Sequence, residues 1–286
     1  MKVIAPAKIN LFLEVGKKIN SYHKIISLLE MITLHDEIEL LPSDRDEIEF
    51  LSEWEIPDDN TIRKTVELIR KITDCKRKVK IKVRKKIPPG SGLGGGSSDA
   101  ASVLKGLNKL WKINFNNEKL LEIGKKVGSD VPFFIFGRRG IIEGCGEIVR
   151  DVNCKTIFKY LLLIPPFQVK TEEIYRELDR EEEYGDLTEG KKKIKILLAA
   201  MEKNNIKEME NIMMNRLEKP CFNFKKEIKE VREEIEKITG RKFFLSGSGG
   251  TLFSILYSEE EVEKVRHLPF LKEWKVFCVR SLFSSE

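Results

Sequence analysis

A glycine-rich segment at residues 87–101 constrains this chain more than any other part of its sequence. The segment reads IPPGSGLGGGSSDAA and holds five glycines within seven residues. Because glycine lacks a Cβ atom, the backbone there can approach another group closely. An amphipathic helix is predicted to follow at once, with Ser97, Ser98 or Asp99 as its N-cap. Free backbone N–H groups and the positive helix end would converge on one point, which suits a polyphosphate.

Two better-known phosphate-binding patterns fit this segment poorly. The pattern GxxxxGK[ST] fails because no lysine follows the glycines. The dinucleotide pattern GxGxxG is matched by Gly90, Gly92 and Gly95, but it requires an acidic residue at the end of a second strand about twenty positions later. Residues 114–118 occupy that place and open a helix instead. A nucleotide-dependent oxidoreductase is therefore a remote alternative. A turn without a ligand is another, but a plain connection between a strand and a helix needs fewer residues than this segment has.

The remaining sequence alternates between strand and helix patterns. Residues 3–15 alternate with period two, which predicts a strand with Ile9, Leu11, Leu13 and Val15 toward the core. Further strands are expected over 29–41, 79–83, 160–164, 242–245, 252–257 and 275–279, and helices over 60–72, 100–111, 118–127, 194–217, 223–238 and 259–268.

The order of these elements indicates an α+β fold, because sheets with helices laid against them belong to that class. A chain of 286 residues is long enough for two domains. The pattern pauses near residue 155, which predicts one domain over 1–155 and a second over 156–286. The charged segment 181–193 is expected to be a mobile surface loop.

Composition argues against several classes of function. The 52 basic and 46 acidic residues leave a net charge of +6, and Lys and Glu are mixed along most helices rather than gathered as in a nucleic-acid-binding protein. No apolar run approaches the roughly 20 residues of a membrane span, and no signal peptide pattern follows Met1. The five cysteines and three histidines show no metal-ligand spacing. We expect a cytoplasmic protein without nucleic-acid or membrane partners, as a monomer or a homodimer.

The glycine-rich segment resembles a known family motif. Pro-x-x-x-Gly-Leu-Gly-x-x-Ser-Ser is the second motif of the GHMP kinases, and the fuller string GLGGGSSDAA looks like their diphosphocytidyl-methylerythritol kinase branch. Residues 6–11 (PAKINL), 128–134 (GSDVPFF) and 246–250 (SGSGG) resemble other blocks of the family, in family order. The resemblance implies a two-domain GHMP kinase fold, with helices packed on an N-terminal sheet and a C-terminal ferredoxin-like α/β sandwich.

The resemblance also implies that the glycine-rich segment binds ATP. The residues that would hold the nucleotide are Pro88, Pro89, Gly90, Ser91, Gly92, Leu93, Gly94, Gly95, Gly96, Ser97 and Ser98, together with Asn60. The hydroxyl of Ser98 would help to hold Mg²⁺, although a simple N-cap explains this serine equally well. Asn60 precedes a predicted helix, so it too suits an N-cap.

Lys8 and Asp130 match the family's catalytic lysine and aspartate. A kinase that acts on an alcohol must orient the hydroxyl and stabilise charge on the transferred group, and a carboxylate can accept the proton. Asp130 precedes the apolar segment 131–136, which would desolvate it and raise its pKa. Lys8 would oppose that rise. Taken alone, Asp130 also suits a helix cap and Lys8 a solvated strand position.

Several residues match the branch's site for a cytidine-bearing acceptor. Tyr22, His23 and Tyr175 would hold the cytosine ring by stacking and by hydrogen bonding, and Asn10 and Thr171 would contact the substrate. Without the family, Tyr22 and His23 suit a surface turn and Tyr175 a half-buried helix position.

The sequence also departs from the branch at three positions. It has Ser21 where glycine is usual, Lys170 where serine is common, and Gly250 where a small polar residue is common.

The expected reaction is ATP-dependent phosphorylation of the 2-hydroxyl of a cytidine-diphosphate-linked polyol, a step of non-mevalonate isoprenoid synthesis. One alternative is another GHMP kinase with a different alcohol acceptor, against which Tyr22 and His23 argue. A second alternative is a non-catalytic nucleotide-binding module of the same fold. The presence of both Lys8 and Asp130 argues against that module.

Overall fold

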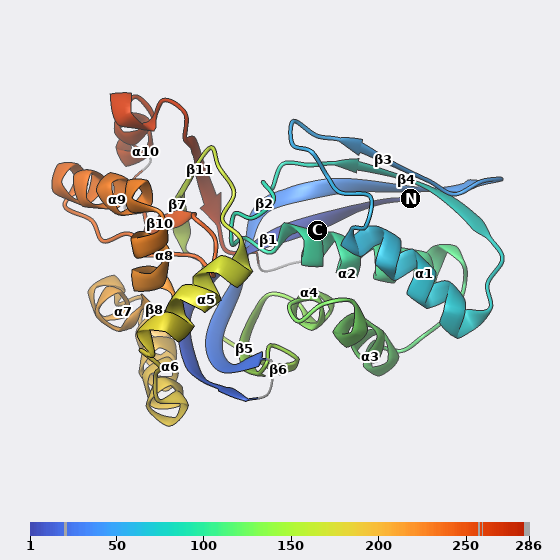
Figure 1. Ribbon diagram of the computed structural model, residues 1–286, viewed down its shortest axis with the longest axis horizontal. Helices are drawn as coiled ribbons and strands as arrows, with labels where there is room; N and C mark the ends of the chain where they lie inside the picture. The colour runs from blue at the N-terminus through green and yellow to red at the C-terminus, as the bar shows by residue number, and fades with distance from the viewer. Residues whose placement is uncertain (20–21, 257, 259, 283–286) are drawn as a thin grey trace.

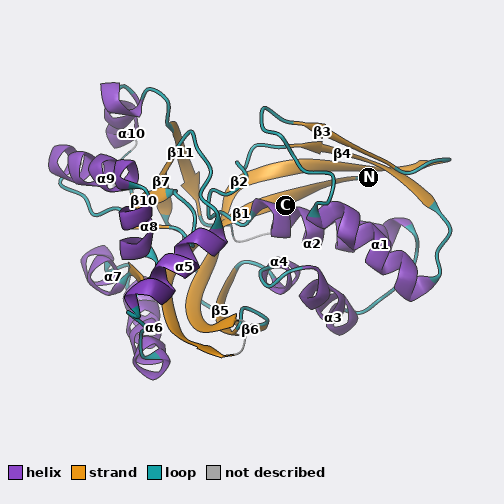
Figure 2. Ribbon diagram, viewed as in Figure 1, coloured by secondary structure: helices purple, strands orange, loops and turns teal. Residues whose placement is uncertain are grey.

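A computed structural model of the chain describes residues 1–19, 22–256, 258 and 260–282. Figures 1 and 2 show two groups of elements, each containing a sheet with helices beside it. The N-terminal group comprises β1 (Lys2–Ile19), β2 (Tyr22–Ser43), β3 (Glu47–Leu51), α1 (Thr61–Thr73), β4 (Lys78–Arg84), α2 (Gly95–Leu110), α3 (Asn117–Val127), α4 (Val131–Phe136), β5 (Arg139–Gly144) and β6 (Ile148–Asp151).

The C-terminal group is built around a smaller sheet. Its elements are β7 (Lys159–Ile164), α5 (Thr171–Glu181), α6 (Leu187–Glu202), α7 (Ile206–Ile212), β8 (Met214–Asn215), α8 (Glu218–Phe224), α9 (Lys226–Thr239), β9 (Phe244–Leu245), β10 (Leu252–Ile255), α10 (Glu260–Arg266), a 3₁₀ turn (Pro269–Leu271) and β11 (Lys275–Arg280). The sheet is antiparallel, in the order β11-β7-β10-β9. With helices after β7 and again after β10, this arrangement is the expected ferredoxin-like βαββαβ unit.

The first sheet is organised by two long antiparallel strands, β1 and β2. In the described residues its order is β3-β4-β2-β1-β8, and β5 with β6 branches from β2. The C-terminal half of β2 pairs with β4, whereas its N-terminal half pairs with β5. The short β8 adds to β1 in parallel, so the C-terminal half of the chain contributes a strand to the N-terminal sheet.

Strand β1 differs from the expected half-buried strand, because residues 7–16 are buried without interruption. Its register to β2 shifts between Asn10 and Phe12, and such a bulge breaks the alternation of faces. Phe12 therefore joins Ile9 in one apolar cluster, although strict alternation placed the two on opposite faces. Leu13, beyond the bulge, belongs to a different cluster. Helix α6 packs against Glu14 and the glycine-rich segment encloses Lys8, so the face that the sequence left to solvent is covered.

A buried ion pair fastens the segment between the two halves. Arg139 of β5 binds the carboxylate of Glu30 on β2, and it also donates to the carbonyl oxygens of Cys154, at 2.5 Å, and Thr156, at 3.0 Å. Tyr160, at the start of the second sheet, donates to the same Glu30. The connection between the halves is thus held by N-terminal side chains, and a domain boundary at residue 155 remains a prediction.

Several expected boundaries are wrong for identifiable reasons. Helix α2 begins inside the glycine run, and its N-cap is Gly94 rather than Ser97, Ser98 or Asp99. Most of the expected loop 181–193 is helical, because α5 runs to its first residue and α6 begins at position 187.

The predicted helix 194–217 is interrupted and contains the short α7 and β8. Asn204 adopts a left-handed conformation, and Asn205 caps α7 by accepting from the amide of Glu208. Strands β3, β5 and β6 were not predicted. The last residue of the expected strand 252–257 and the first of the expected helix 259–268 lie outside the described residues.

The other predicted elements are present, with ends shifted by a few residues. The exception is the strand expected at 29–41, which starts earlier, as β2 at Tyr22. Among the helices in the described ranges, none combines the length and apolar character that a membrane crossing needs.

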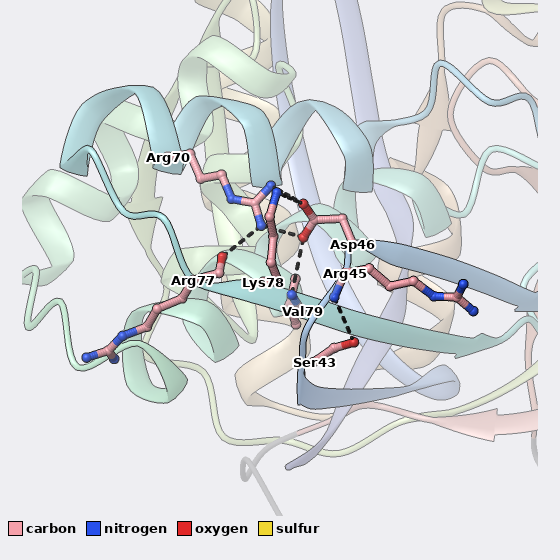
Figure 3. A network of polar contacts seen from close by, with 7 residues as sticks. All are labelled: Ser43, Arg45, Asp46, Arg70, Arg77, Lys78 and Val79. Carbon is pink, nitrogen blue, oxygen red and sulfur yellow. Dashed lines mark hydrogen bonds and ion pairs between the residues drawn. The ribbon is translucent and has the colours of Figure 1, made fainter.

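Asp46 anchors α1 to the edge of the first sheet (Figure 3). Its carboxylate accepts from Arg70 of α1 at 2.9 Å, from the ammonium of Lys78 at 2.9 Å and from the amide of Val79 at 3.2 Å. Burial disfavours the charged carboxylate, but the hydrogen bonds outweigh it and lower the pKa of Asp46 to about 2. The site-bearing helix α2 packs beside α1, so this anchor supports the layer of helices.

We expect Asp46→Asn to lower the free energy of unfolding by about 1 kcal/mol at neutral pH, because it weakens an ion-pair network. The folded pKa lies below the unfolded value of 3.8, so this stabilisation is present above pH 3.8 and is lost as the pH falls toward 2. Urea denaturation across that range is the measurement. The neighbouring Asp44, which has no ion pair among the described residues, is the control as Asp44→Asn. An equal loss in both variants contradicts the prediction.

Candidate active site

A cavity of about 880 Å³ brings together most of the residues predicted from the sequence. The predicted residues that line it are Lys8, Asn10, Tyr22, His23, Asn60, Pro88, Pro89, Gly90, Ser91, Gly92, Gly94, Gly95, Gly96, Ser97, Asp130, Thr171 and Tyr175. Leu93 and Ser98 do not line it. The side chain of Leu93 lies in the apolar core, and Ser98 is fully buried in α2.

Two glycine segments, residues 90–96 and 246–250, pack backbone to backbone beside this cavity. Gly92 has a φ of +81°, and a Cβ atom there would overlap the carbonyl oxygen of Ser246. A Cβ atom on Gly249 would in turn overlap the backbone at Ser91 and Gly92. The amide of Thr251 donates to the carbonyl oxygen of Ser91 at 3.3 Å. Both segments require glycine because each occupies the space that a side chain of the other would need.

Lys8 is buried between the glycine loop and its own strand, with 4% of its surface exposed. Its ammonium donates to Asn10 Oδ1 at 2.6 Å and to the carbonyl oxygen of Gly92 at 2.7 Å. Burial lowers the pKa of Lys8, and the negative charge of Asp130 opposes that shift. The solvated-strand interpretation of Lys8 is therefore wrong, because the glycine loop and the strand enclose its charge.

Asp130 stands at the N-terminal end of α4 but does not cap it. Its side chain makes no capping hydrogen bond, although it precedes Val131, the first residue of the helix, and Pro132 lies in the first turn. The residue is half-buried and lines the cavity. No ion pair joins it to Lys8 in the described part of the chain, although its charge acts on that lysine. The two groups therefore face one space that a reacting hydroxyl can enter.

The first turn of α2 has partners that the sequence did not indicate. Lys85 forms ion pairs with Asp36 and with Asp99, the latter at 2.7 Å, and all three are buried. Asp36 also accepts from the amide of Ile87 at 2.9 Å. Burial, partly offset by Lys85, raises the pKa of Asp99 to about 7. This cluster links Lys85, which precedes the glycine loop, and Asp99, which follows it, to Asp36 of β2.

The fit of a magnesium ion can be tested on the same helix turn. The Oγ atom of Ser98 is buried and has no hydrogen-bond partner in the described part of the chain, so its lone pairs are available. Across the described ranges, no group of three or more His, Cys, Asp or Glu could hold a metal ion. One hydroxyl fits a magnesium ion that takes its other ligands from water and phosphate oxygens.

One part of the cavity wall, called here the aromatic end, carries Tyr22, His23 and Tyr175. Tyr22 lines the cavity and is exposed to solvent, whereas His23 is buried with 8% of its surface accessible. Tyr175 of α5 lies with its ring centroid 5.1 Å from that of His23. Thr171, one turn earlier, shares a hydrogen bond of 2.7 Å with Ser248 of the second glycine segment. Asn10 donates to Ser27 Oγ at 3.0 Å while its oxygen accepts from Lys8.

The departure at Gly250 has a local explanation, whereas nothing in the structure explains the one at Lys170. Lys170 takes the N-cap position of α5 without a capping bond from its side chain. A Cβ atom at Gly250 would lie 2.7 Å from Pro165 and 3.1 Å from Ile228, so the packing of this domain favours glycine there. Ser21 lies outside the described residues.

Sequence reasoning missed several residues of the cavity wall, including Lys18, Lys85, Asp99 and Asp179. Asp179 follows Tyr175 by four positions on α5, and this spacing places both on one helix face. The spacing could therefore have identified Asp179 from the predicted role of Tyr175. Lys85 offered no comparable signal, because it follows a strand in which every second residue is basic.

Comparison with known families supports the resemblance from both ends of the chain. The family described as GHMP kinases N terminal domain matches residues 60–138, and that described as GHMP kinases C terminal matches residues 197–267. A curated 4-diphosphocytidyl-2-C-methyl-D-erythritol kinase from Carboxydothermus hydrogenoformans is 33% identical, covering 93% of this chain and 91% of the relative. The enzyme of that name from Thermodesulfovibrio yellowstonii is 35% identical, covering 90% of each.

Solved structures agree in fold. A crystal structure of 4-(cytidine 5'-diphospho)-2C-methyl-D-erythritol kinase superposes with a TM-score of 0.81 at 27% identity, covering 99% of this chain and 100% of that chain. Homoserine kinase from Cytophaga hutchinsonii gives a TM-score of 0.73 at 17% identity, over 99% and 94% of the two chains. The second likeness shows the fold alone.

We expect Gly92→Ala to lower the free energy of unfolding by at least about 2 kcal/mol, because it strains a left-handed backbone and forces two loops apart. Chemical denaturation measures this change. Gly96→Ala is the matched control, since a Cβ atom there would lie 3.4 Å from Thr61 Oγ1 and the backbone is helical. A Gly92→Ala protein as stable as the Gly96→Ala protein would show that the two glycine segments are not in contact.

Proposed function

The chain belongs to the 4-diphosphocytidyl-2-C-methyl-D-erythritol kinases of the GHMP kinase family, and on that premise we propose how its residues carry out phosphoryl transfer. The reaction moves the γ-phosphoryl group of ATP to the 2-hydroxyl of 4-diphosphocytidyl-2-C-methyl-D-erythritol. This step belongs to non-mevalonate isoprenoid synthesis. The shared cavity of the glycine loop, Lys8, Asp130 and the aromatic residues is the observation that carries the assignment of roles.

In this proposal the glycine loop holds the triphosphate. Residues 90–96 line the cavity at the N-terminal end of α2, apart from Leu93, whose carbonyl oxygen accepts from the amide of Lys8 at 2.9 Å. Backbone N–H groups and the positive helix end supply the attraction for the phosphates. Asn60 caps α1 through its side-chain oxygen and also lines the cavity, so it is placed to contact the nucleotide.

Lys8 and Asp130 act at the reacting centre. The carboxylate of Asp130 orients the acceptor hydroxyl and takes its proton as the phosphoryl group is transferred. The ammonium of Lys8 stabilises the negative charge on the transferred group, and its hydrogen bonds to Asn10 and Gly92 hold it in place. The low polarity around Lys8 strengthens that electrostatic effect.

Ser98 Oγ would be the protein ligand of a magnesium ion at the proposed nucleotide site. When bound, that ion would supply positive charge to offset the phosphates of ATP. The cluster of Asp36, Lys85 and Asp99 holds the turn of α2 that carries Ser98, and thereby keeps this hydroxyl in position.

The aromatic end of the cavity receives the cytidine group. Tyr22 and Tyr175 offer ring faces for stacking, and His23 offers a ring nitrogen to the polar edge of the base. Asn10 is hydrogen bonded to Lys8 and Thr171 to Ser248 of the second glycine segment, and both line the cavity, so they are placed to contact the acceptor's diphosphate and polyol.

We also propose that the protein acts in the cytoplasm without a nucleic-acid or membrane partner. The net charge of +6 is a small excess of basic over acidic residues, and the basic residues are not gathered in one part of the sequence. A monomer and a homodimer are both compatible with this chemistry.

The acceptor is tested by measuring ADP release with a panel of alcohols. We expect turnover with 4-diphosphocytidyl-2-C-methyl-D-erythritol and none with mevalonate or homoserine, because only the first carries a base for Tyr22, His23 and Tyr175. Reactions without an acceptor give the background hydrolysis of ATP. Turnover with mevalonate or homoserine in place of the cytidine compound would overturn the substrate assignment.

We expect Asp130→Asn and Lys8→Ala each to lower kcat by about 10²–10⁴-fold, since each removes a group that acts in the transition state. Both variants should bind ATP, because the glycine loop is unchanged, and circular dichroism should show an intact fold. Lys17→Ala, on the exposed end of β1, is the control and should retain full turnover. An Asp130→Asn protein with native kcat would end the assignment of that residue.

A further inference from the structure

His23 makes one hydrogen bond that the proposed reaction does not require. Its Nε2 atom lies 2.7 Å from Oδ1 of Asp179, which projects from α5. Asp179 also accepts from the hydroxyl of Tyr184 at 3.0 Å, and the ammonium of Lys18 lies 3.4 Å from its second oxygen. The Asp179 carboxylate therefore lies among three donors, and one of them is the imidazole of His23, which is proposed to contact the base.

This contact determines which nitrogen of His23 carries the proton. Burial opposes ionisation of Asp179, but the hydrogen bonds from His23, Tyr184 and Lys18 outweigh it and lower its pKa, so the group is a carboxylate at neutral pH. A carboxylate can only accept a hydrogen bond, so Nε2 must carry the hydrogen. In a neutral imidazole the other nitrogen, Nδ1, is then an acceptor.

The Nδ1 atom is the part of the ring left for a ligand. It has no hydrogen-bond partner among the described residues, and it is not among their fully buried polar atoms. Because His23 lines the cavity, an acceptor nitrogen is presented where the base is proposed to bind. The rings of Tyr175 and Tyr184, 5.1 and 6.0 Å away between centroids, limit how far the imidazole can turn.

Cytosine and uracil differ at the edge that such a nitrogen would meet. Cytosine carries an amino group at C4, which donates hydrogen bonds, whereas uracil carries a carbonyl oxygen there, which accepts them. An acceptor at Nδ1 pairs with the amino group and repels the oxygen. Discrimination of this kind is strong, because the rejected ligand leaves a polar group of the site unpaired.

We propose that Asp179 is a specificity-determining residue, which makes the enzyme select cytidine over uridine acceptors by fixing His23 as the Nε2–H tautomer. The proposal rests on the proposed function, since it takes the aromatic end of the cavity as the base site. Asp179 itself is a positioning residue that acts through His23.

The test compares kcat/KM for 4-diphosphocytidyl-2-C-methyl-D-erythritol with that for its uridine counterpart, at pH 8, where an ordinary imidazole is neutral. We expect the native enzyme to favour the cytidine compound by at least about 100-fold. In Asp179→Asn the amide can donate to Nε2, which allows His23 to adopt the tautomer with its hydrogen on Nδ1. The preference for the cytidine compound should then fall by at least about tenfold. The loss should arise partly from better use of the uridine compound, which a merely structural defect would not produce.

Two further variants serve as controls. Tyr184→Phe removes one hydrogen bond from the carboxylate but keeps the contact between Asp179 and His23, so the preference should stay native. Asp179→Glu keeps the charge and should retain more of the preference than Asp179→Asn does. An unchanged preference in Asp179→Asn, or a native enzyme that uses both acceptors equally, would refute the proposal while leaving the kinase function intact.

The tautomer can be measured without turnover. The chain has three histidines, so two-bond ¹H–¹⁵N spectra of the native protein can be assigned by substituting His35 and His267. We expect His23 to carry its hydrogen on Nε2, and a signal from Nδ1–H would refute the proposal even if Asp179→Asn does not fold. A native protein that phosphorylates neither acceptor would instead refute the proposed function, and the spectra would still report the tautomer.

Discussion

The close contact between two glycine segments is the constraint on which the rest of the site depends. Gly92 and Gly249 approach so closely that neither position has room for a Cβ atom. The first segment comes from the N-terminal half of the chain and the second from the C-terminal half, so the contact also fixes how the halves meet. With the glycine loop held in this way, its carbonyl at Gly92 accepts from Lys8 and its end becomes the start of α2.

Burial of Lys8 follows from the same arrangement and has an electrostatic cost. A lysine in an apolar setting loses hydration, which lowers its pKa, and the opposing charge of Asp130 recovers part of that loss. No ion pair closes the space between the two groups in the described residues, so each keeps capacity for a ligand. A direct ion pair would have stabilised the empty site and competed with the substrate hydroxyl.

Much of the architecture was predictable from local pattern. Helix α1 and strand β4 were found because their apolar spacing matches one buried face, and the glycine loop because its composition has few structural explanations. The environment of β1 was not predictable in this way. A bulge next to Asn10 changes which side chains share a face, and long-range packing buries polar residues that alternation assigns to solvent. Glycines 95 and 96 also hid the true start of α2, because they occupy its first two helical positions and glycine has a low helix propensity.

The position of α5 connects the proposed base site to the proposed phosphate site. In Figure 1 this helix lies at the junction of the two groups of elements. Its first residue, Thr171, is hydrogen bonded to Ser248 of the second glycine segment, and its later turns present Tyr175 and Asp179 to His23. This hydrogen bond links the helix that carries Tyr175 and Asp179 to the segment packed against the glycine loop. Because the Gly92 carbonyl of that loop accepts from Lys8, one series of contacts joins the proposed base site to the proposed reacting groups.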